Sequence, residues 1–292
     1  MESKSLQCSI NEREFVLFRD YIAKISGIVI PPERAYLVET RLSKLMLDAG
    51  VESFGKFYDY ITAGNDPGIS QKIIDAVTIN ETMWFRDAMP WQVLERITLP
   101  ALVGELISGR KSKIRIWCAA VSTGQEAYSA AMCIDDYLTK NNIEGVDLSH
   151  FDIFATDISS RVLEAAKNGR YDKISIMRGL NEYYRGKYFT SAANGASWDI
   201  DPRIKDAVRF MRFNLQDSYR SFGTFDIIFC RYVLIYFSEE LNKEIAVKLN
   251  GSLADGGLLF TGNYVLYDLF SNDFDTKPYN NSTYFSKKSE KV

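Results

Sequence analysis

The first part of the chain carries hydrophobic residues at helical spacing in four successive segments. The apolar positions are Phe15, Phe18, Ile22 and Ile25; Val38, Leu42, Leu45 and Ala49; Phe54, Phe57, Tyr58 and Ile61; and Ile69, Ile73, Ile74 and Val77. Gly27 and Gly50 follow the first two segments as stop signals. We expect the fourth helix to open at Asp66-Pro67, a cap residue followed by proline at the first helical position. The pattern predicts a small all-helical domain over residues 1–90.

Short apolar runs replace the helical pattern in the remainder, residues 91–292. They are IRIWC (114–118), FDIFAT (151–156), FDIIFC (225–230) and GLLFTG (257–262). Helical segments near 125–140 and 159–168 separate the first three runs, and another near 238–250, with Ser238 as a candidate cap, follows the third. Strands that alternate with helices predict an α/β fold with a parallel sheet covered on both faces.

Two segments depart from this alternation. Residues 170–208 are rich in Tyr, Gly, Asn and Asp, which predicts an inserted hairpin or small β-subdomain. The last run, STYFSK (282–287), follows without room for a crossover helix. We therefore expect it to pair antiparallel at the end of the sheet.

Composition is that of a globular protein, with 46% hydrophobic and 25% charged residues among 292. A net charge of −3 gives no overall attraction to nucleic acid. The N-terminus has no apolar signal core, and no apolar run approaches the roughly 18 residues of a membrane span. His150 is the single histidine, and the cysteines form no CxxC pair, so we expect neither a zinc site nor a Ser–His pair. These features predict a cytoplasmic protein without a metal.

A turn of small residues after the first strand is the first candidate for ligand binding. In RIWCAAVSTGQEAYSAAM (115–132) a predicted strand is followed by a turn of small residues at 119–124, and a helix begins directly after the turn. Ligands of open parallel sheets bind beside such turns, at the carboxyl ends of the strands. The turn lacks the GxxxxGK and GxGxxG patterns, and Glu126 would repel a phosphate. The alternative is a plain connection between strand and helix.

Asp157 ends the second predicted strand. A carboxylate in this position can accept hydrogen bonds from both hydroxyls of a ribose. Alternatively, Asp157 caps the following helix, a role that Ser159 could also serve. A ribose-binding acid without a phosphate loop indicates a nucleoside ligand that carries no phosphate, and S-adenosylmethionine is the foremost candidate.

Five segments together resemble the successive motifs of the CheR-type chemotaxis receptor methyltransferases. They are INETMWFRD (79–87), the 115–132 segment, FATDIS (154–159), FNLQD (213–217) and FDIIFCRYVLIYF (225–237). The resemblance covers nearly the whole chain. It implies a Rossmann-like S-adenosylmethionine-dependent methyltransferase sheet with an all-helical N-terminal domain and an inserted small β-subdomain. It also implies an enzyme that methylates glutamate side chains of methyl-accepting chemoreceptors during chemotaxis adaptation.

The resemblance also implies roles for particular residues. Glu126 would bind the methionine amino end of the cofactor and Asp157 the ribose, and Tyr236 would face the methyl group. The cofactor-binding set comprises Asn80, Thr82, Arg86, Glu126, Asp157, Asn214, Leu215, Arg231 and Tyr232, with Asn214 and Leu215 at the adenine, and the catalytic set comprises Arg86, Arg231 and Tyr236.

The proposed chemistry suits a chain with so little histidine. A glutamate side chain, with an ordinary pKa of about 4.3, is already an ionised nucleophile at neutral pH and needs no general base. An arginine near the methyl group, Arg86 or Arg231, would orient the incoming carboxylate. In the alternative interpretations, Arg86 is a surface residue paired with Asp87 or Glu81, and Tyr236 is a core aromatic residue.

The chain departs from the pattern of the resembled family at three places. Tyr232 replaces an asparagine, Gln125 and Ala127 replace Glu and Pro, and GNYV (262–265) replaces a GHSE-like segment. They leave two other functions open: a degenerate module that binds cofactor or receptor with little activity, and a methyltransferase with a different acceptor.

The implied partner is the cytoplasmic helical bundle of a receptor, which would provide the chain's only link to the membrane. Arg34, Arg41 and Lys44 recur at roughly helical spacing and are candidates to face that bundle. The β-subdomain of some family members docks a C-terminal tethering peptide of the receptor by strand addition.

Overall fold

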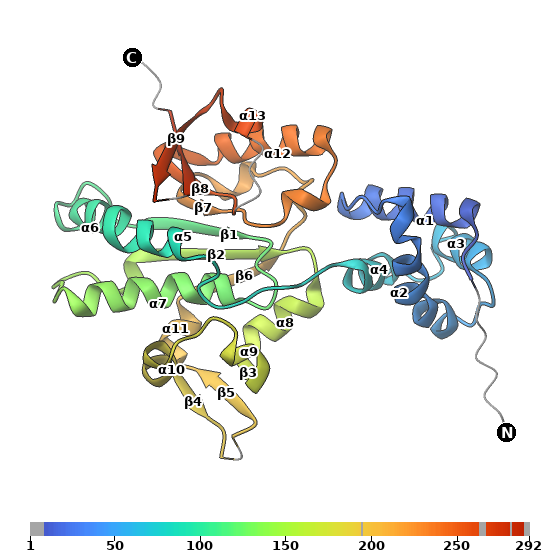
Figure 1. Ribbon diagram of the computed structural model, residues 1–292, viewed down its shortest axis with the longest axis horizontal. Helices are drawn as coiled ribbons and strands as arrows, with labels where there is room; N and C mark the ends of the chain where they lie inside the picture. The colour runs from blue at the N-terminus through green and yellow to red at the C-terminus, as the bar shows by residue number, and fades with distance from the viewer. Residues whose placement is uncertain (1–8, 194, 263–266, 281, 289–292) are drawn as a thin grey trace.

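The computed structural model describes residues 9–193, 195–262, 267–280 and 282–288. Its first helices are α1 (Glu12–Ser26), α2 (Ala35–Asp48), α3 (Phe54–Thr62) and α4 (Ile69–Val77), with the short turn η1 (Pro32–Arg34) before α2. They lie together at one side of the sheet (Figure 1) and enclose their own apolar core. Gly27 ends α1 in the left-handed conformation that favours glycine, with φ 77°.

The start of α4 differs from the prediction. The helix begins at Ile69, and Asp66-Pro67 belongs to the preceding turn. The Asp66 carboxylate accepts the N–H of Gly68 at 2.7 Å. This hydrogen bond from residue 68 to the side chain of residue 66 therefore closes an Asx turn and does not cap a helix.

The central sheet has the strand order β6-β2-β1-β7-β8-β10-β9 in the described residues. Five strands are parallel: β1 (Ile114–Ala119), β2 (Phe151–Asp157), β6 (Val208–Arg212), β7 (Phe225–Phe229) and β8 (Leu253–Phe260). The predicted antiparallel pairing of β10 (Ser282–Lys287) is confirmed. However, β9 (Phe274–Tyr279) and not β10 forms the edge. The sequence analysis missed β6 and β9 because both are edge strands whose side chains are mostly outside the core.

Helices cover both faces of this sheet (Figure 1). The alternation of side chains along β1 shows the two faces, because Ile116 and Cys118 belong to one core and Trp117 and Ala119 to the other. The first core includes residues of α5 (Ala88–Val93), the π-turn η2 (Leu94–Thr98), α6 (Leu99–Ile107), α7 (Gln125–Lys140) and α8 (Ser160–Asn168). The second includes residues of α12 (Glu239–Gly251) and α13 (Tyr267–Phe270). The short turns η3 (Leu148–His150), η4 (Arg220–Phe222) and η5 (Leu234–Tyr236) complete the connections.

The predicted β-subdomain is present between α8 and β6. It is an antiparallel sheet of β3 (Arg170–Asp172), β5 (Ser197–Ile200) and β4 (Phe189–Ser191), in the order β3-β5-β4. The short helices α9 (Lys173–Met177), α10 (Glu182–Tyr188) and α11 (Pro202–Asp206) accompany it. The Gly- and Asn-rich composition had not indicated these helices.

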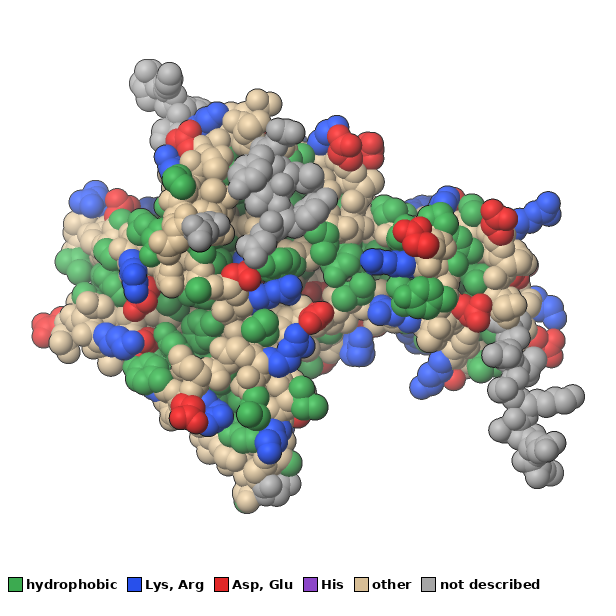
Figure 2. Space-filling view, viewed as in Figure 1, with side chains coloured by type: hydrophobic (Ala, Val, Ile, Leu, Met, Phe, Trp, Pro, Cys, Tyr) green, Lys and Arg blue, Asp and Glu red, His purple; other side chains and the backbone are tan. Residues whose placement is uncertain are grey.

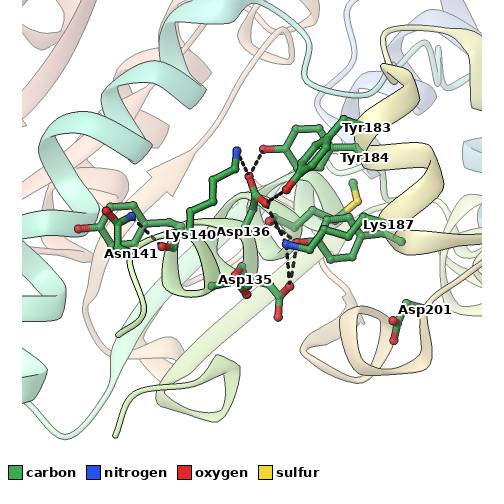
Figure 3. Close-up of polar contacts among 12 residues, drawn as sticks. Asp135, Asp136, Lys140, Asn141, Tyr183, Tyr184, Lys187 and Asp201 are labelled. Carbon is green, nitrogen blue, oxygen red and sulfur yellow. Dashed lines mark hydrogen bonds and ion pairs between the residues drawn. The ribbon is translucent and has the colours of Figure 1, made fainter. Parts of the chain in front are cut away.

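A buried acid joins this insertion to α7 (Figure 3). Asp136, whose side chain is 2% exposed, accepts hydrogen bonds from the Tyr183 hydroxyl at 2.5 Å and the Lys187 ammonium at 2.9 Å. Lys140 lies 2.6 Å away, and Tyr184 is the fourth donor. Burial by itself would raise the pKa of Asp136, but these donors outweigh it and lower that pKa. We call these five residues the insertion cluster.

Candidate functional site

A pocket lies between the N-terminal helices and the carboxyl ends of the parallel strands. Parallel strands end at the same edge of a sheet, so residues far apart in sequence meet there. The space-filling view shows Lys and Arg side chains on both sides of this junction (Figure 2). The structure brings every predicted site residue to this pocket: Asn80, Thr82, Arg86, Glu126, Asp157, Asn214, Leu215, Arg231, Tyr232 and Tyr236.

The turn after β1 forms one wall of the pocket through Ala120, Val121 and Ser122. Its hydrogen bonds fix two neighbouring segments. The backbone N–H of Ser122 donates to the Asp157 carboxylate at 2.8 Å, and its hydroxyl donates to the carbonyl of Asn80 at 2.8 Å. Gly124 precedes α7 with φ 93°, and a Cβ there would lie 3.0 Å from that of Ala166. The turn thus joins the ends of β1 and β2 to the segment that carries Asn80.

Asp157 is buried, with 6% of its surface exposed. One carboxylate oxygen accepts the N–H of Ser122 and the other accepts the N–H of Ser159 at 2.9 Å. The burial raises the pKa of Asp157 despite these hydrogen bonds. The hydroxyl of Ser159 caps α8, so Asp157 is not the capping residue. Each carboxylate oxygen keeps a further lone pair for a ligand.

Arg231 follows β7 and is the cation at the centre of the site. Its side chain is 2% exposed, and its guanidinium pairs with Glu126 at 2.7 Å and Asp87 at 2.6 Å. Burial lowers the pKa of Arg231, but the two carboxylates outweigh that effect and raise it. For Glu126 burial is the stronger influence, and the pKa of this carboxyl is raised although Arg231 pulls it down. A single guanidinium therefore serves two acids, of which Glu126 is mostly buried and Asp87 is partly exposed.

One donor of this arginine is unused. The buried Nε of Arg231 has no hydrogen-bond partner among the described residues. A buried donor without an acceptor is costly, by about 1–3 kcal/mol. Such a donor fits a pocket whose ligand brings its own acceptor, and a carboxylate is the strongest candidate.

Arg86 contacts a ring and a backbone carbonyl. Its guanidinium carbon is 3.7 Å from the centroid of the Tyr232 ring, and one nitrogen donates to the carbonyl of Glu81 at 3.4 Å. The alternative pairing with Asp87 or Glu81 is absent from the described part of the chain. Asp87 pairs with Arg231, and the Glu81 carboxylate pairs with Arg178 at 2.7 Å.

Two site residues, Asn214 and Tyr236, also connect the N-terminal helices to the larger part of the chain. The Asn214 amide donates to the carbonyl of Ile25 in α1 at 3.0 Å, and the carbonyl of Tyr236 accepts the N–H of Val29 at 2.8 Å. The side chain of Tyr236 is half-buried against the pocket, and burial raises its pKa. Leu215 is buried beside Asn214. These hydrogen bonds therefore fix the N-terminal helices relative to the strand ends on the other side of the pocket.

The sequence analysis gave Asp87 and Ser122 no role of their own at the site. Backbone strain marks them in the structure, because Phe85, Asp87, Ala120, Ser122 and Tyr232 all have positive φ. In the described residues they make up five of the seven such positions outside glycine. Residues in this region cost about 1–3 kcal/mol each and cluster at functional sites. Sequence alone carries no signal for them, because none is a glycine, asparagine or proline.

The arginines expected to face a partner divide into different roles. Arg34 is exposed at the pocket, whereas Arg41 donates to the carbonyl of Val77 at 2.7 Å and so closes the end of α4. Lys44 is exposed and does not line the pocket. Of the 262–265 departure, residues 263–265 lie outside the described residues.

Within the described ranges, no group of three or more His, Cys, Asp and Glu side chains could hold a metal ion. In the same residues no helix has the length and hydrophobicity to cross a membrane.

Comparison with known proteins gives the same family for both parts of the chain. Residues 80–276 match the family model described as "CheR methyltransferase, SAM binding domain", and residues 13–78 match "CheR methyltransferase, all-alpha domain". The chain is 42% identical over 249 residues to chemotaxis protein methyltransferase 1 of Pseudomonas aeruginosa, covering 85% of this chain and 88% of that protein. It is 39% identical to chemotaxis protein methyltransferase Cher2 of Pseudomonas putida, covering 87% and 90%. It is 38% identical to a chemotaxis protein methyltransferase of Vibrio parahaemolyticus, covering 87% and 89%.

Proposed function

The chain belongs to the CheR methyltransferase family, and from that premise we propose that it methylates glutamate side chains of chemoreceptors to form methyl esters. S-adenosylmethionine is its cofactor. The observation that carries the proposal is the convergence of Asp157, Glu126, Arg231 and Arg86 on one pocket at the strand ends. It contains an acid suited to a ribose, a shared cation and a second cation that pairs with no carboxylate among the residues that the structure describes.

The pocket residues divide into groups that would hold different parts of the cofactor. Asp157, with lone pairs left over from its two backbone hydrogen bonds, would accept from the ribose hydroxyls. Asn214 and Leu215 would hold the adenine, and Glu126 the amino group of the methionine end. The Nε of Arg231, which has no hydrogen-bond partner among the described residues, would donate to a carboxylate of the ligand. When bound, the cofactor supplies an electrophilic methyl group on a sulfonium.

The acceptor side needs orientation more than proton transfer. A glutamate carboxylate is ionised well above its ordinary pKa of about 4.3, so no base is required. Arg86 would orient it by a charge-assisted hydrogen bond, and the Tyr236 side chain would lie beside the reacting atoms. Holding two reactants in line contributes up to roughly 7–11 kcal/mol in well-oriented cases.

The receptor would reach the pocket at its exposed arginine and could also use the insertion. Arg34 is exposed at the pocket and suits an acidic helix. Strands β3 and β4 are the edges of the small sheet, and an extended receptor peptide could pair with such an edge. Both contacts are part of the proposal, and they would place a peripheral enzyme at the membrane only through its receptor.

The test is transfer of tritiated methyl groups from labelled S-adenosylmethionine to receptor-containing membranes. We expect label in the receptor band that mild base releases as methanol, the signature of a methyl ester. Replacement of the acceptor glutamates by alanine in the receptor is the matched control and should remove the label. Base-stable label would indicate a different acceptor group. Cofactor binding in calorimetry without any transfer would support a binding module instead.

A further inference from the structure

Tyr232 departs from the family pattern and lies in a strained conformation. It has φ 58°, in the left-handed region that asparagine tolerates better than tyrosine. The family's usual asparagine is therefore the residue that the local backbone favours. A tyrosine that persists in this conformation is stabilised by its surroundings.

The Tyr232 side chain makes contacts that an asparagine could not reproduce. Its ring lies under the Arg86 guanidinium, with 3.7 Å between the guanidinium carbon and the ring centroid. Its hydroxyl donates to the Asp87 carboxylate at 2.5 Å, to the oxygen that also accepts from Arg231. Gly262 lies close to the ring, and a Cβ there would come within 3.0 Å of it. The ring is thus packed against a glycine and a cation.

These contacts leave Arg86 oriented without neutralising its charge. The two carboxylates nearest in sequence are both engaged elsewhere: Asp87 with Arg231 and Tyr232, and Glu81 with Arg178. An aromatic face attracts a guanidinium but carries no net charge. A carboxylate in its place would compete with the acceptor glutamate for the same donors. One Arg86 nitrogen donates to the carbonyl of Glu81, and the arrangement leaves the positive charge of the guanidinium available to an incoming anion.

We infer that Tyr232 is a positioning residue whose ring holds Arg86 over the pocket, while Arg231 holds Asp87. The inference rests on the proposed function, because the anion that Arg86 awaits is the acceptor carboxylate. Tyr232 acts through Arg86 and does not itself take part in the transfer. Its effect is therefore on recognition of the acceptor more than on binding of the cofactor.

The experiment compares Tyr232→Leu with Tyr232→Phe. Both variants keep a strained residue without a favourable left-handed preference, so the backbone cost is matched. Phenylalanine keeps the ring under Arg86, and leucine removes it. We expect Tyr232→Leu to raise the KM for receptor by about 5- to 30-fold, the equivalent of one cation–π contact. We expect Tyr232→Phe to stay within about threefold, and cofactor affinity of either variant to change less than the receptor KM.

A double variant shows whether Tyr232 acts through Arg86. In an Arg86→Ala background, Tyr232→Leu should have no further effect on the receptor KM. An equal effect in both backgrounds would overturn the inference. Tyr183→Leu is the control, since Tyr183 also binds a carboxylate and faces a lysine but lies in the insertion cluster. It should leave the Arg86 signal described next unchanged.

A measurement without acceptor separates this inference from the proposed function. The Nε–H resonance of Arg86, assigned by its loss in Arg86→Ala, should be shifted upfield by the Tyr232 ring. The shift should persist in Tyr232→Phe and vanish in Tyr232→Leu. A shift that survives in Tyr232→Leu would refute the positioning role even if receptors are methylated. Failure to label receptors with this shift intact would refute the proposed function alone.

Discussion

Helix α7 carries buried acids in two contrasting environments. Near its start Glu126 faces the pocket, and burial raises its pKa because the single Arg231 is shared with Asp87. About 15 Å further along the helix, Asp136 lies under the insertion, where two lysines and two tyrosines donate to it and its pKa is lowered. Glu126 shares the Arg231 guanidinium with a second carboxylate, whereas Asp136 has four donors of its own.

The difference separates binding from stability. An acid surrounded by its own donors has no remaining need for a ligand, and it joins two parts of the chain. Acids that share one cation, beside a guanidinium nitrogen without an acceptor, retain unsatisfied interactions that a ligand can complete. The pocket also concentrates the strained backbone positions, of which the insertion cluster has none among its described residues. Four changes would break or sharpen this contrast.

The largest effect is expected from Arg231→Ala. It leaves the mostly buried Glu126 without its cation, which costs about 3–5 kcal/mol of unfolding free energy, and it also removes the partner of the partly exposed Asp87. Urea unfolding measures that loss, and labelled methyl transfer should fall to background. Arg203→Ala is the control, because Arg203 is an exposed arginine paired with Asp135 and Asp201, and we expect a change below about 1 kcal/mol. Near-normal turnover in Arg231→Ala would contradict a role in the pocket.

Asp136→Asn should destabilise the protein without affecting the cofactor. The substitution removes the charge that Lys140 and Lys187 share, and we expect a loss of about 2 kcal/mol in unfolding free energy. Calorimetry should give an unchanged affinity for S-adenosylmethionine. A weakened affinity would mean that the two ends of α7 are coupled and that the contrast drawn here is wrong.

Asp157→Ala should have the opposite effects to Asp136→Asn: weaker cofactor binding with little change in stability. We expect at least tenfold weaker cofactor binding, about 1.4 kcal/mol, since the ribose acceptor is lost. Asp152→Ala at the other end of the same strand is the control, because Asp152 pairs with Arg115 and Arg209 away from the pocket. Equal affinities for wild type and Asp157→Ala in calorimetry would show that the ribose binds elsewhere.

The smallest effect is a pH dependence of opposite sign for the two acids of α7. The lowered pKa of Asp136 means that its stabilisation is complete above the unfolded pKa of about 3.9 and is lost as pH falls toward the lowered value. The raised pKa of Glu126 means that the folded state binds a proton at this carboxyl more tightly than the unfolded state does. The stabilisation from this proton is present below the unfolded pKa and is lost as pH rises through the raised pKa of the folded state. Chemical unfolding of Asp136→Asn and Glu126→Gln from pH 3 to 7 measures both terms, and slopes of the same sign would contradict the assignment.

Local patterns in the sequence predicted most of the fold. Periodic apolar residues located α1 to α4, and the alternation of apolar strand runs with helical segments located α7, α8 and α12. They missed the edge strands β6 and β9 and the helical stretch that contains α5 and α6. An edge strand has a weak apolar pattern, since few of its side chains enter the core.

The sequence by itself determined which residues meet at the pocket, in part because parallel strands end at one edge and in part because its motifs resemble those of the CheR family. Only the tertiary structure decided which of the charged residues pair. Asp87 is adjacent to Arg86 in sequence, yet a left-handed turn at Asp87 leaves its carboxylate on Arg231 and Arg86 on the ring of Tyr232. The physical reason is that ion pairs depend on distances of a few ångströms between side chains from separate elements, and only packing sets those distances.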